Sequence, residues 1–176
     1  MSKLETNTID TISGTTNLTI GSTNSSTVTF ENGAVTGHCY PAFHVRLSGN
    51  QNLSNNVATT IAFDTEDVDT DSAFASNTFT VPSGKGGKYF IYANLRFQSA
   101  DDFEAIRLVI RKNSTNHLSY WGRNEYYQNM YLGGIIDLAA ADTVDVQARQ
   151  SSGGSINVGA SDSGTITFFG GYRIGA

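Results

Sequence analysis

An acidic run at residues 64–71, DTEDVDTD, is the densest group of candidate metal ligands in the sequence. Alternate side chains of an extended segment point to one side, and hard carboxylate oxygens in that arrangement suit calcium. The central glycine and the late glutamate of an EF-hand loop are missing. The run therefore predicts either a solvated acidic loop or a weak calcium site formed by Asp67, Asp69 and Asp71, and no other cofactor is expected.

Nucleophilic chemistry has one weak candidate, the sequence cluster of His38, Cys39 and His44. A cysteine beside a histidine can act as a nucleophile, but no third group is evident that would orient this pair. The turn SGKGGKY at 83–89 lacks the spacing of a phosphate-binding loop and leads into a strand instead of a helix. No Gly-x-Ser-x-Gly elbow is present, so the chain is predicted not to be an enzyme.

The segment SYWGRNEYYQNMY, at residues 119–131, is the most distinctive candidate for a binding surface. Amphipathic rings beside amide and charged groups suit the recognition of sugars or proteins. The predicted ligand-binding residues are Tyr120, Trp121, Arg123, Tyr126 and Tyr127. The alternative is that these aromatic residues lie in strands and line the core or the axis of an oligomer.

Composition excludes several classes of protein. The net charge of −5 and the pI near 5.0 argue against a nucleic-acid partner, which needs a basic face. The single Cys excludes a disulfide framework and a cysteine-based zinc site. No apolar run approaches the length of a membrane span, and the first ten residues do not form a secretory signal, so membrane insertion is not expected.

Residues 1–37 differ in composition from the rest of the chain. They carry ten of the twenty Thr residues and one aromatic residue, Phe30, and NLTIG (17–21) is followed ten residues later by TVTFE (27–31). Such short alternating units bury too little to fold alone and would gain stability by stacking on neighbours or on other chains. The segment is predicted to be an ordered β-repeat anchor, with a flexible linker as the alternative.

Residues 38–176 contain many short segments of alternating polarity with turn residues between them. Ser, Thr, Asn and Gly make up 71 of the 176 residues, which does not fit a helical bundle. In AFHVRLSG, Phe43, Val45 and Leu47 share one face, and KYFIYANLRFQ continues this pattern over a longer strand. The pattern predicts an all-β fold with two antiparallel sheets, a sandwich or jelly roll.

Some predicted strands are apolar on both faces. Phe90 and Tyr92 lie opposite the inward residues of their strand. In the last strand, alternation places Phe168 and Tyr172 on one side and Phe169 on the other. Because a second apolar face must meet another surface, Phe90, Tyr92 and Phe169 are predicted to form a subunit interface. The alternative is that a loop of the same chain covers them.

Taken in order, the motifs of the second region resemble the globular C1q domain family, which is related to the tumour-necrosis-factor jelly roll. The family pattern has Ala-Phe, Phe-Asp, Phe-x-x-Pro-x-x-Gly-x-Tyr, Lys-Asn, Leu-x-x-x-Asp-x-Val and Phe-x-Gly. The matching positions are Ala42, Phe43, Phe63, Asp64, Phe79, Pro82, Tyr89, Lys112, Asn113, Leu138, Asp142, Val144, Phe168 and Gly171. The resemblance covers residues 42–176, with a slightly longer turn around Lys85.

The resemblance implies a jelly roll of about ten strands that assembles as a compact homotrimer. The N-terminal segment resembles the Thr, Ser, Asn and Gly-rich β-repeats of phage fibres rather than a collagen stalk. The chain is therefore expected to be a bacteriophage virion protein, assembled in the bacterial cytoplasm. Its head at 38–176 would be attached to other virion proteins through residues 1–37, which would also contribute to trimerisation. It would serve as a capsid cement or decoration protein, a head fibre or a short tail fibre, or alternatively as an adhesin tip that binds host glycans or proteins.

Overall fold

The computed structural model describes residues 41–98, 105–122, 128–159 and 166–175. All of them belong to one compact unit, Gly37–Ala176, which is called the head below. The predicted anchor at residues 1–37, with the boundary after it, lies outside the described residues.

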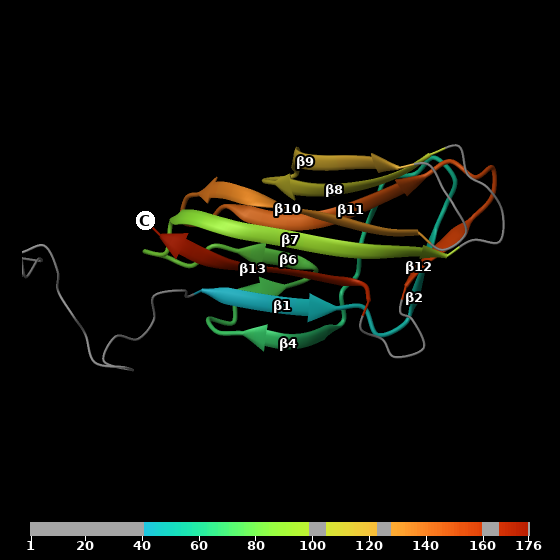
Figure 1. Ribbon diagram of the computed structural model, residues 1–176. Helices are drawn as coiled ribbons and strands as arrows, with labels where there is room; N and C mark the ends of the chain where they lie inside the picture. The colour runs from blue at the N-terminus through green and yellow to red at the C-terminus, as the bar shows by residue number, and fades with distance from the viewer. Residues whose placement is uncertain (1–40, 99–104, 123–127, 160–165, 176) are drawn as a thin grey trace, which may run out of the picture. The chain divides into compact units, whose positions relative to one another are not determined.

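Two antiparallel sheets form the head (Figure 1). Sheet A has the order β2 (Asn50–Leu53), β12 (Ile156–Gly159), β7 (Gly87–Gln98), β13 (Phe168–Gly175), β1 (Ala42–Arg46) and β4 (Thr65–Asp69), and β10 (Gln128–Leu138) also pairs with β7. Sheet B has the order β5 (Phe74–Ala75), β6 (Thr78–Thr80), β11 (Thr143–Gln150), β8 (Ile106–Lys112) and β9 (Thr115–Gly122), and β3 (Thr59–Thr60) also pairs with β11. The prediction of an all-β fold with two antiparallel sheets is confirmed.

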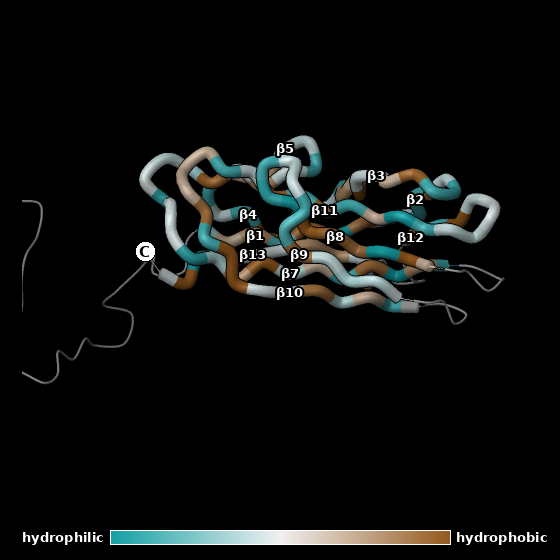
Figure 2. The backbone as a smooth tube through the Cα atoms, turned by 90° about the horizontal axis from the view of Figure 1, so that it is seen from above, coloured by the Kyte–Doolittle hydropathy of each residue, from teal (hydrophilic) through white to brown (hydrophobic). Residues whose placement is uncertain are grey.

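Strand β7 supplies the centre of the core. Its alternate residues Tyr89, Ile91, Ala93, Leu95 and Phe97 are all fully buried, as the period of two predicts. They pack in one hydrophobic cluster with the inward residues of β8 and β11 in sheet B. Figure 2 shows hydrophobic residues along β8 and β10, whereas the turns are mostly hydrophilic. Removal of this apolar surface from water is the main stabilising contribution to such a sandwich.

Four phenylalanines join β1 to three other strands within the core. The ring of Phe43 stacks on Phe79 with centroids 4.3 Å apart and meets Phe169 edge-on at 4.9 Å. Phe74 stacks on the same ring at 5.9 Å. Offset and edge-on contacts of this kind are the preferred aromatic geometries, so the Phe43 ring ties both sheets together.

A polar cluster closes the turn before β11 and joins two of the motifs that resemble the C1q family. The Asp142 carboxylate accepts hydrogen bonds from Asn113 Nδ2 and the Ala139 amide, each at 2.7 Å. Lys112 Nζ lies 2.8 Å from the same carboxylate. Asn113 (φ 49°) and Ser114 (φ 63°) form the two-residue turn between β8 and β9, where asparagine tolerates left-handed backbone better than most residues.

Two sequence-based expectations of local structure need correction. For the acidic run, the alternative of a solvated loop is wrong about the loop but not about the exposure. Residues 65–69 form β4, which pairs with β1 and is held by the bond from Arg46 to Asp67, and most of its residues are exposed. The segment NVATTIAFD, at residues 56–64, has the composition of a strand and predicts one over its length, but only Thr59–Thr60 pairs with β11. Beyond this pair the chain is held by the amide of Ile61, which donates to the Val146 carbonyl at 2.9 Å.

We expect Asp142→Asn to lower the free energy of unfolding at neutral pH by about 1–3 kcal/mol, since it removes an ion pair and weakens several hydrogen bonds. Hydrogen bonds from Lys112 and Asn113 hold the pKa of Asp142 at about 2, below the usual 3.8. This contribution is therefore complete above the usual pKa and is lost as the pH falls towards 2. Urea unfolding at a series of pH values measures the difference.

The control is Asp137→Asn, which changes an exposed carboxylate on β10 and should alter stability by less than about 0.5 kcal/mol. An Asp142→Asn penalty that persists undiminished at the lowest pH would show that the ionised carboxylate is not the source of the stabilisation.

Candidate functional site

The outward surface of sheet A carries a group of aromatic and aliphatic side chains together with one histidine, which we call the outer aromatic face. Its members are Phe90 and Tyr92 of β7, Tyr131 and Ile135 of β10, Phe168, Tyr172 and Ile174 of β13, and His44 of β1. Ile135 is 63% exposed and Tyr131 is 56% exposed. Large apolar groups gathered on one face of a small domain commonly mark an interaction site.

Strand register brings these residues together. Ile135 of β10 pairs with Phe90, and Phe90 pairs on its other side with Tyr172. One row further along the sheet, Tyr92 lies between two glycines, Gly133 and Gly170. A Cβ at Gly170 would lie only 2.5 Å from the Tyr92 hydroxyl, so the glycine lets the tyrosine ring lie across β13.

The rings of the outer aromatic face contact one another. Centroids are 6.0 Å apart for Phe90 and Tyr92, and 5.8 Å apart for Phe90 and Tyr172. Phe168 meets the Tyr92 ring edge-on at 6.1 Å. Because the rings support each other and rest on paired strands, this face is formed before any partner binds, which lowers the entropic cost of binding.

His44 is the ionisable group set within the outer aromatic face. Its Nδ1 is 3.0 Å from the Tyr92 hydroxyl, and its ring centroid is 5.3 Å from that of Phe168. Burial lowers the pKa of His44 below the usual 6.5, and Arg46 adds to this effect while Asp67 opposes it. Burial also raises the pKa of Tyr92. The face is therefore set up to hold a neutral imidazole against a neutral phenol.

One predicted interface residue lies elsewhere. Phe90 and Tyr92 point outward as expected, but Phe169 is fully buried and packs against Phe43 and Phe63 in the core. The assignment of Phe169 to an interface is therefore wrong. The two faces of β13 are reversed relative to the sequence expectation, and Phe168 is the phenylalanine that points outward.

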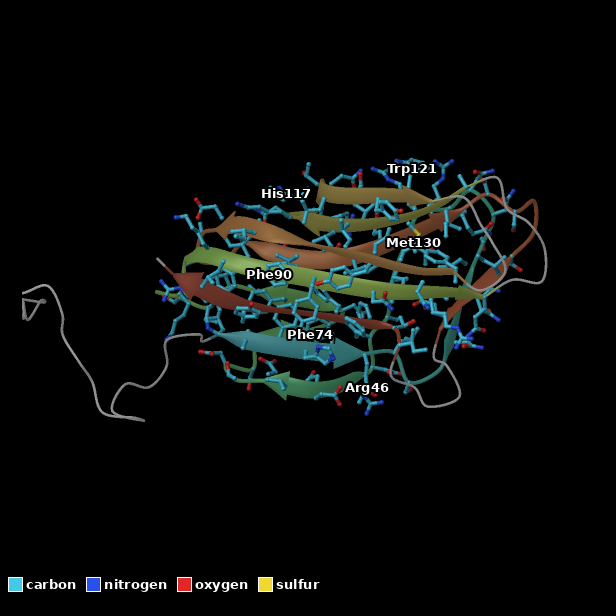
Figure 3. All side chains as sticks on the ribbon, viewed as in Figure 1. Arg46, Phe74, Phe90, His117, Trp121 and Met130 are labelled. Atoms are coloured by element: carbon cyan, nitrogen blue, oxygen red, sulfur yellow. The ribbon has the colours of Figure 1, made fainter. Side chains whose placement is uncertain are left out.

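A second surface lies on the outward side of sheet B. A pocket of about 90 Å³ is lined by Asn56, Ala105, Trp121, Arg149, Gln150 and Ser151. We call it the arginine pocket, because Arg149 lines it and the Arg107 guanidinium lies 4.9 Å from the centroid of the Trp121 ring. Trp121, on β9, is 53% exposed and lies in a different sheet from Phe90 of β7, as Figure 3 shows.

The structure divides the predicted aromatic binding segment. Tyr120 and Trp121 are both exposed but are adjacent on β9, so their side chains leave opposite faces of the strand. Arg123, Tyr126 and Tyr127 lie outside the described residues. Arg107, Arg149 and Asn56 are not predicted as site residues from the sequence. Strand pairing brings Arg107 and Arg149 together across 42 residues of sequence, and Asn56 meets Arg149 through a hydrogen bond. The available signal was the arginine opposite the apolar residues in each of the alternating segments AIRLVIRKN and TVDVQARQ.

The carboxylates of the predicted calcium site each have their own partner. Asp67 accepts both of its hydrogen bonds from Arg46 Nε at 3.0 Å. Asp69 accepts from the amides of Ala73 and Phe74, and Asp71 accepts from the Thr70 hydroxyl at 2.8 Å. Within the described ranges no group of three His, Cys, Asp or Glu side chains is arranged to hold a metal ion.

The other chemical candidates are only partly covered by the described residues. His38 and Cys39 lie outside the described residues, and His44 contacts Tyr92 and Phe168. The turn at 83–89 is fixed by the Tyr89 hydroxyl, which donates to the Lys85 carbonyl at 2.5 Å. In the described part of the chain there is no helix of the length and hydrophobicity needed to cross a membrane.

The fold and these surfaces define a C1q/TNF-like jelly-roll domain. The structure is similar to the globular domain of zebrafish complement 1qA protein, with 17% identity and a TM-score of 0.54 over 76% of this chain and 97% of that one. It is also similar to murine APRIL at pH 5.0, with 16% identity and a TM-score of 0.58 over 78% and 99% of the two chains. The corresponding values for Eiger TNF from S. frugiperda are 15% and 0.55 over 75% and 90%.

No protein-family model matches the chain, and no curated protein matches it in sequence. At these identities the structural likeness establishes the fold. The predicted C1q/TNF-like jelly roll is thus confirmed.

We expect the free energy of unfolding to fall as the pH drops below about 6.5, because the unfolded chain binds a proton at His44 more readily than the folded chain does. His44→Gln should flatten this part of the pH dependence. Denaturant unfolding between pH 5 and pH 7.5 measures it. His117→Gln, which changes an exposed residue of β9, serves as the control and should leave the slope intact. An unchanged slope in His44→Gln would rule out His44 as its source.

Proposed function

We propose that the head associates into a homotrimer through its outer aromatic face. The observation that carries this proposal is the exposure of Tyr131, Ile135, Tyr172 and Ile174 on one preformed face of sheet A. A single chain leaves these side chains in water, and association would remove them at a gain of roughly 25 cal/mol per Å² of apolar area.

The number three comes from the family resemblance, which implies a compact trimer. The C1q/TNF-like fold supports it, and the position of the outer aromatic face on one sheet suits close packing around a threefold axis. Polar and charged side chains at the margin of this face, such as Arg46, Asn94 and Arg96, suit the rim of an interface.

The trimer is proposed to be a structural component of a bacteriophage virion, a knob that stabilises or decorates the particle. Support comes from the Thr, Ser, Asn and Gly-rich repeats of residues 1–37, which suit attachment to other virion proteins. Its role is mechanical rather than catalytic. A capsid cement protein, a head fibre and a short tail fibre all fit this description.

A second candidate function is that of an adhesin tip that binds a host glycan or protein. The observation that favours it is the arginine pocket, which places an exposed indole beside a guanidinium on the outward side of sheet B. Because this surface is distinct from the outer aromatic face, three copies could act together with increased avidity.

We expect Ile135→Asp to convert the trimer to monomers without unfolding the head. The side chain is exposed in the single chain, whereas in the proposed trimer the new carboxylate would be buried without a partner at a cost on the order of 3 kcal/mol or more per subunit. Sedimentation velocity measures the oligomeric state. The matched control is Val57→Asp, at a residue that is 50% exposed outside the outer aromatic face.

A wild-type chain that sediments as a monomer, or an Ile135→Asp variant that remains trimeric, would remove the basis of the proposal.

The virion role is tested by cryo-electron microscopy and mass spectrometry of particles produced with the full chain and with a chain that lacks residues 1–37. The full chain should be present on particles at a defined site, and the shortened chain should stay trimeric but be absent from them. A full chain that never accompanies purified particles would refute the virion role while leaving the trimer untouched.

A further inference from the structure

The arginine pocket contains a charge arrangement that the fold itself does not require. On neighbouring strands β8 and β11, Arg107 pairs directly with Arg149, and Arg107 pairs on its other side with Trp121 of β9. Residues directly opposite one another on neighbouring strands lie close together, and like charges in such pairs are destabilising. The three side chains therefore form one row on the outward side of sheet B.

The same two strands also contain a stabilising cross-strand pair, in which an arginine faces a carboxylate. Four residues further along β8, Arg111 pairs with Asp145, and two hydrogen bonds of 2.7 and 2.6 Å join their side chains. Arg107 and Arg149 have no such partner, since none of the ion pairs among the described residues includes either of them. Among the described residues, one end of this strand pair thus has a carboxylate partner for its arginine, and the other end has two arginines without one.

The environment of these two arginines increases the attraction for an anion. The indole of Trp121 covers the Arg107 guanidinium, and the buried Arg107 Nε has no hydrogen-bond acceptor in the part of the chain that the structure describes. Arg149 Nη2 donates to Asn56 Oδ1 at 3.1 Å, a neutral partner that fixes the side chain but leaves its charge in place. Partial removal from water strengthens the interaction of a guanidinium with an added anion.

The base of the pocket is rigid, and its polar groups are already bonded. The side-chain Nε2 of Gln150 donates to the carbonyls of Leu53 and Gly154, and its Oε1 accepts from the backbone amide of Ser152. The Ser151 hydroxyl accepts a hydrogen bond from the Ala105 amide at 3.0 Å. The groups left to bind a ligand are therefore the edge of the Arg149 guanidinium and the exposed face of the Trp121 indole.

From this arrangement we propose that the arginine pocket binds an acidic saccharide, with the sugar ring stacked on Trp121 and its anionic group held by Arg149 with Arg107 nearby. An indole face suits the apolar side of a pyranose ring, and a guanidinium suits a carboxylate or sulfate. The pocket volume of about 90 Å³ fits one ring substituent and not a whole oligosaccharide. This inference rests on the second candidate function and is independent of the trimer.

The single tryptophan of the chain reports on this pocket alone. We expect glucuronic acid to change the tryptophan fluorescence of the full-length protein saturably, with a dissociation constant on the order of millimolar, and uncharged glucose to bind at least about tenfold more weakly. Glucose 6-sulfate is titrated in parallel. Whichever of the two charged sugars binds more tightly identifies the anionic group that the pocket prefers.

The test variant is Arg149→Gln, which should weaken binding of the charged sugar at least about tenfold and remove most of its salt dependence. The matched control is Lys85→Gln, which removes one positive charge in the turn before β7 and should leave binding unchanged. Circular dichroism and sedimentation of the same samples show that fold and oligomeric state are retained.

Each of the following outcomes would overturn the inference. The first three are equal binding of glucose and glucuronic acid, the absence of any saturable change with either charged sugar, and full binding by Arg149→Gln. The inference would also be overturned if acetate or inorganic sulfate bound as tightly as the charged sugars, because stacking on Trp121 would then contribute nothing. None of these results bears on the trimer, which the sedimentation of the same samples measures separately.

Discussion

The alternation of strand β7 is the constraint on which the rest of the head depends. Its inward residues are all buried in the core, while its outward residues include Phe90 and Tyr92 in the first half of the strand and Asn94 and Arg96 in the second. A strand that is apolar on both sides must be covered on both sides. Sheet B covers the inward side of β7, and the partner proposed for the outer aromatic face would cover its outward side.

The sequence predicted β7 well because polar and apolar residues differ clearly along most of it. The same reasoning failed for β13, where FFGGYRIG offers two adjacent phenylalanines and two glycines, so polarity alone cannot choose the inward side. Packing made the choice, since Phe169 fills the space beside Phe43. Thr167 continues that inward side because its hydroxyl donates to the Gly159 carbonyl, which satisfies a buried polar group.

The motifs that resemble the C1q family have physical reasons in the structure. Asp142, Lys112 and Asn113 meet at one turn, and Phe79 and Tyr89 contact in the core. The arginine pocket was not predictable in this way, because it arises from strand register between distant segments. The acidic run at 64–71 is exposed, as one alternative from the sequence has it, but pairing with β1 and the Arg46–Asp67 ion pair make part of it a strand instead of a loop.

That acidic strand also determines how copies of the head can meet. β4 stands at the end of the strand order in sheet A and carries Glu66, Asp67 and Asp69 along a rim that would otherwise accept backbone pairing. Carboxylates on two such rims repel each other, and the terminal strands β2 and β5 are short. Edge-to-edge pairing of two heads through these three strands is thereby disfavoured.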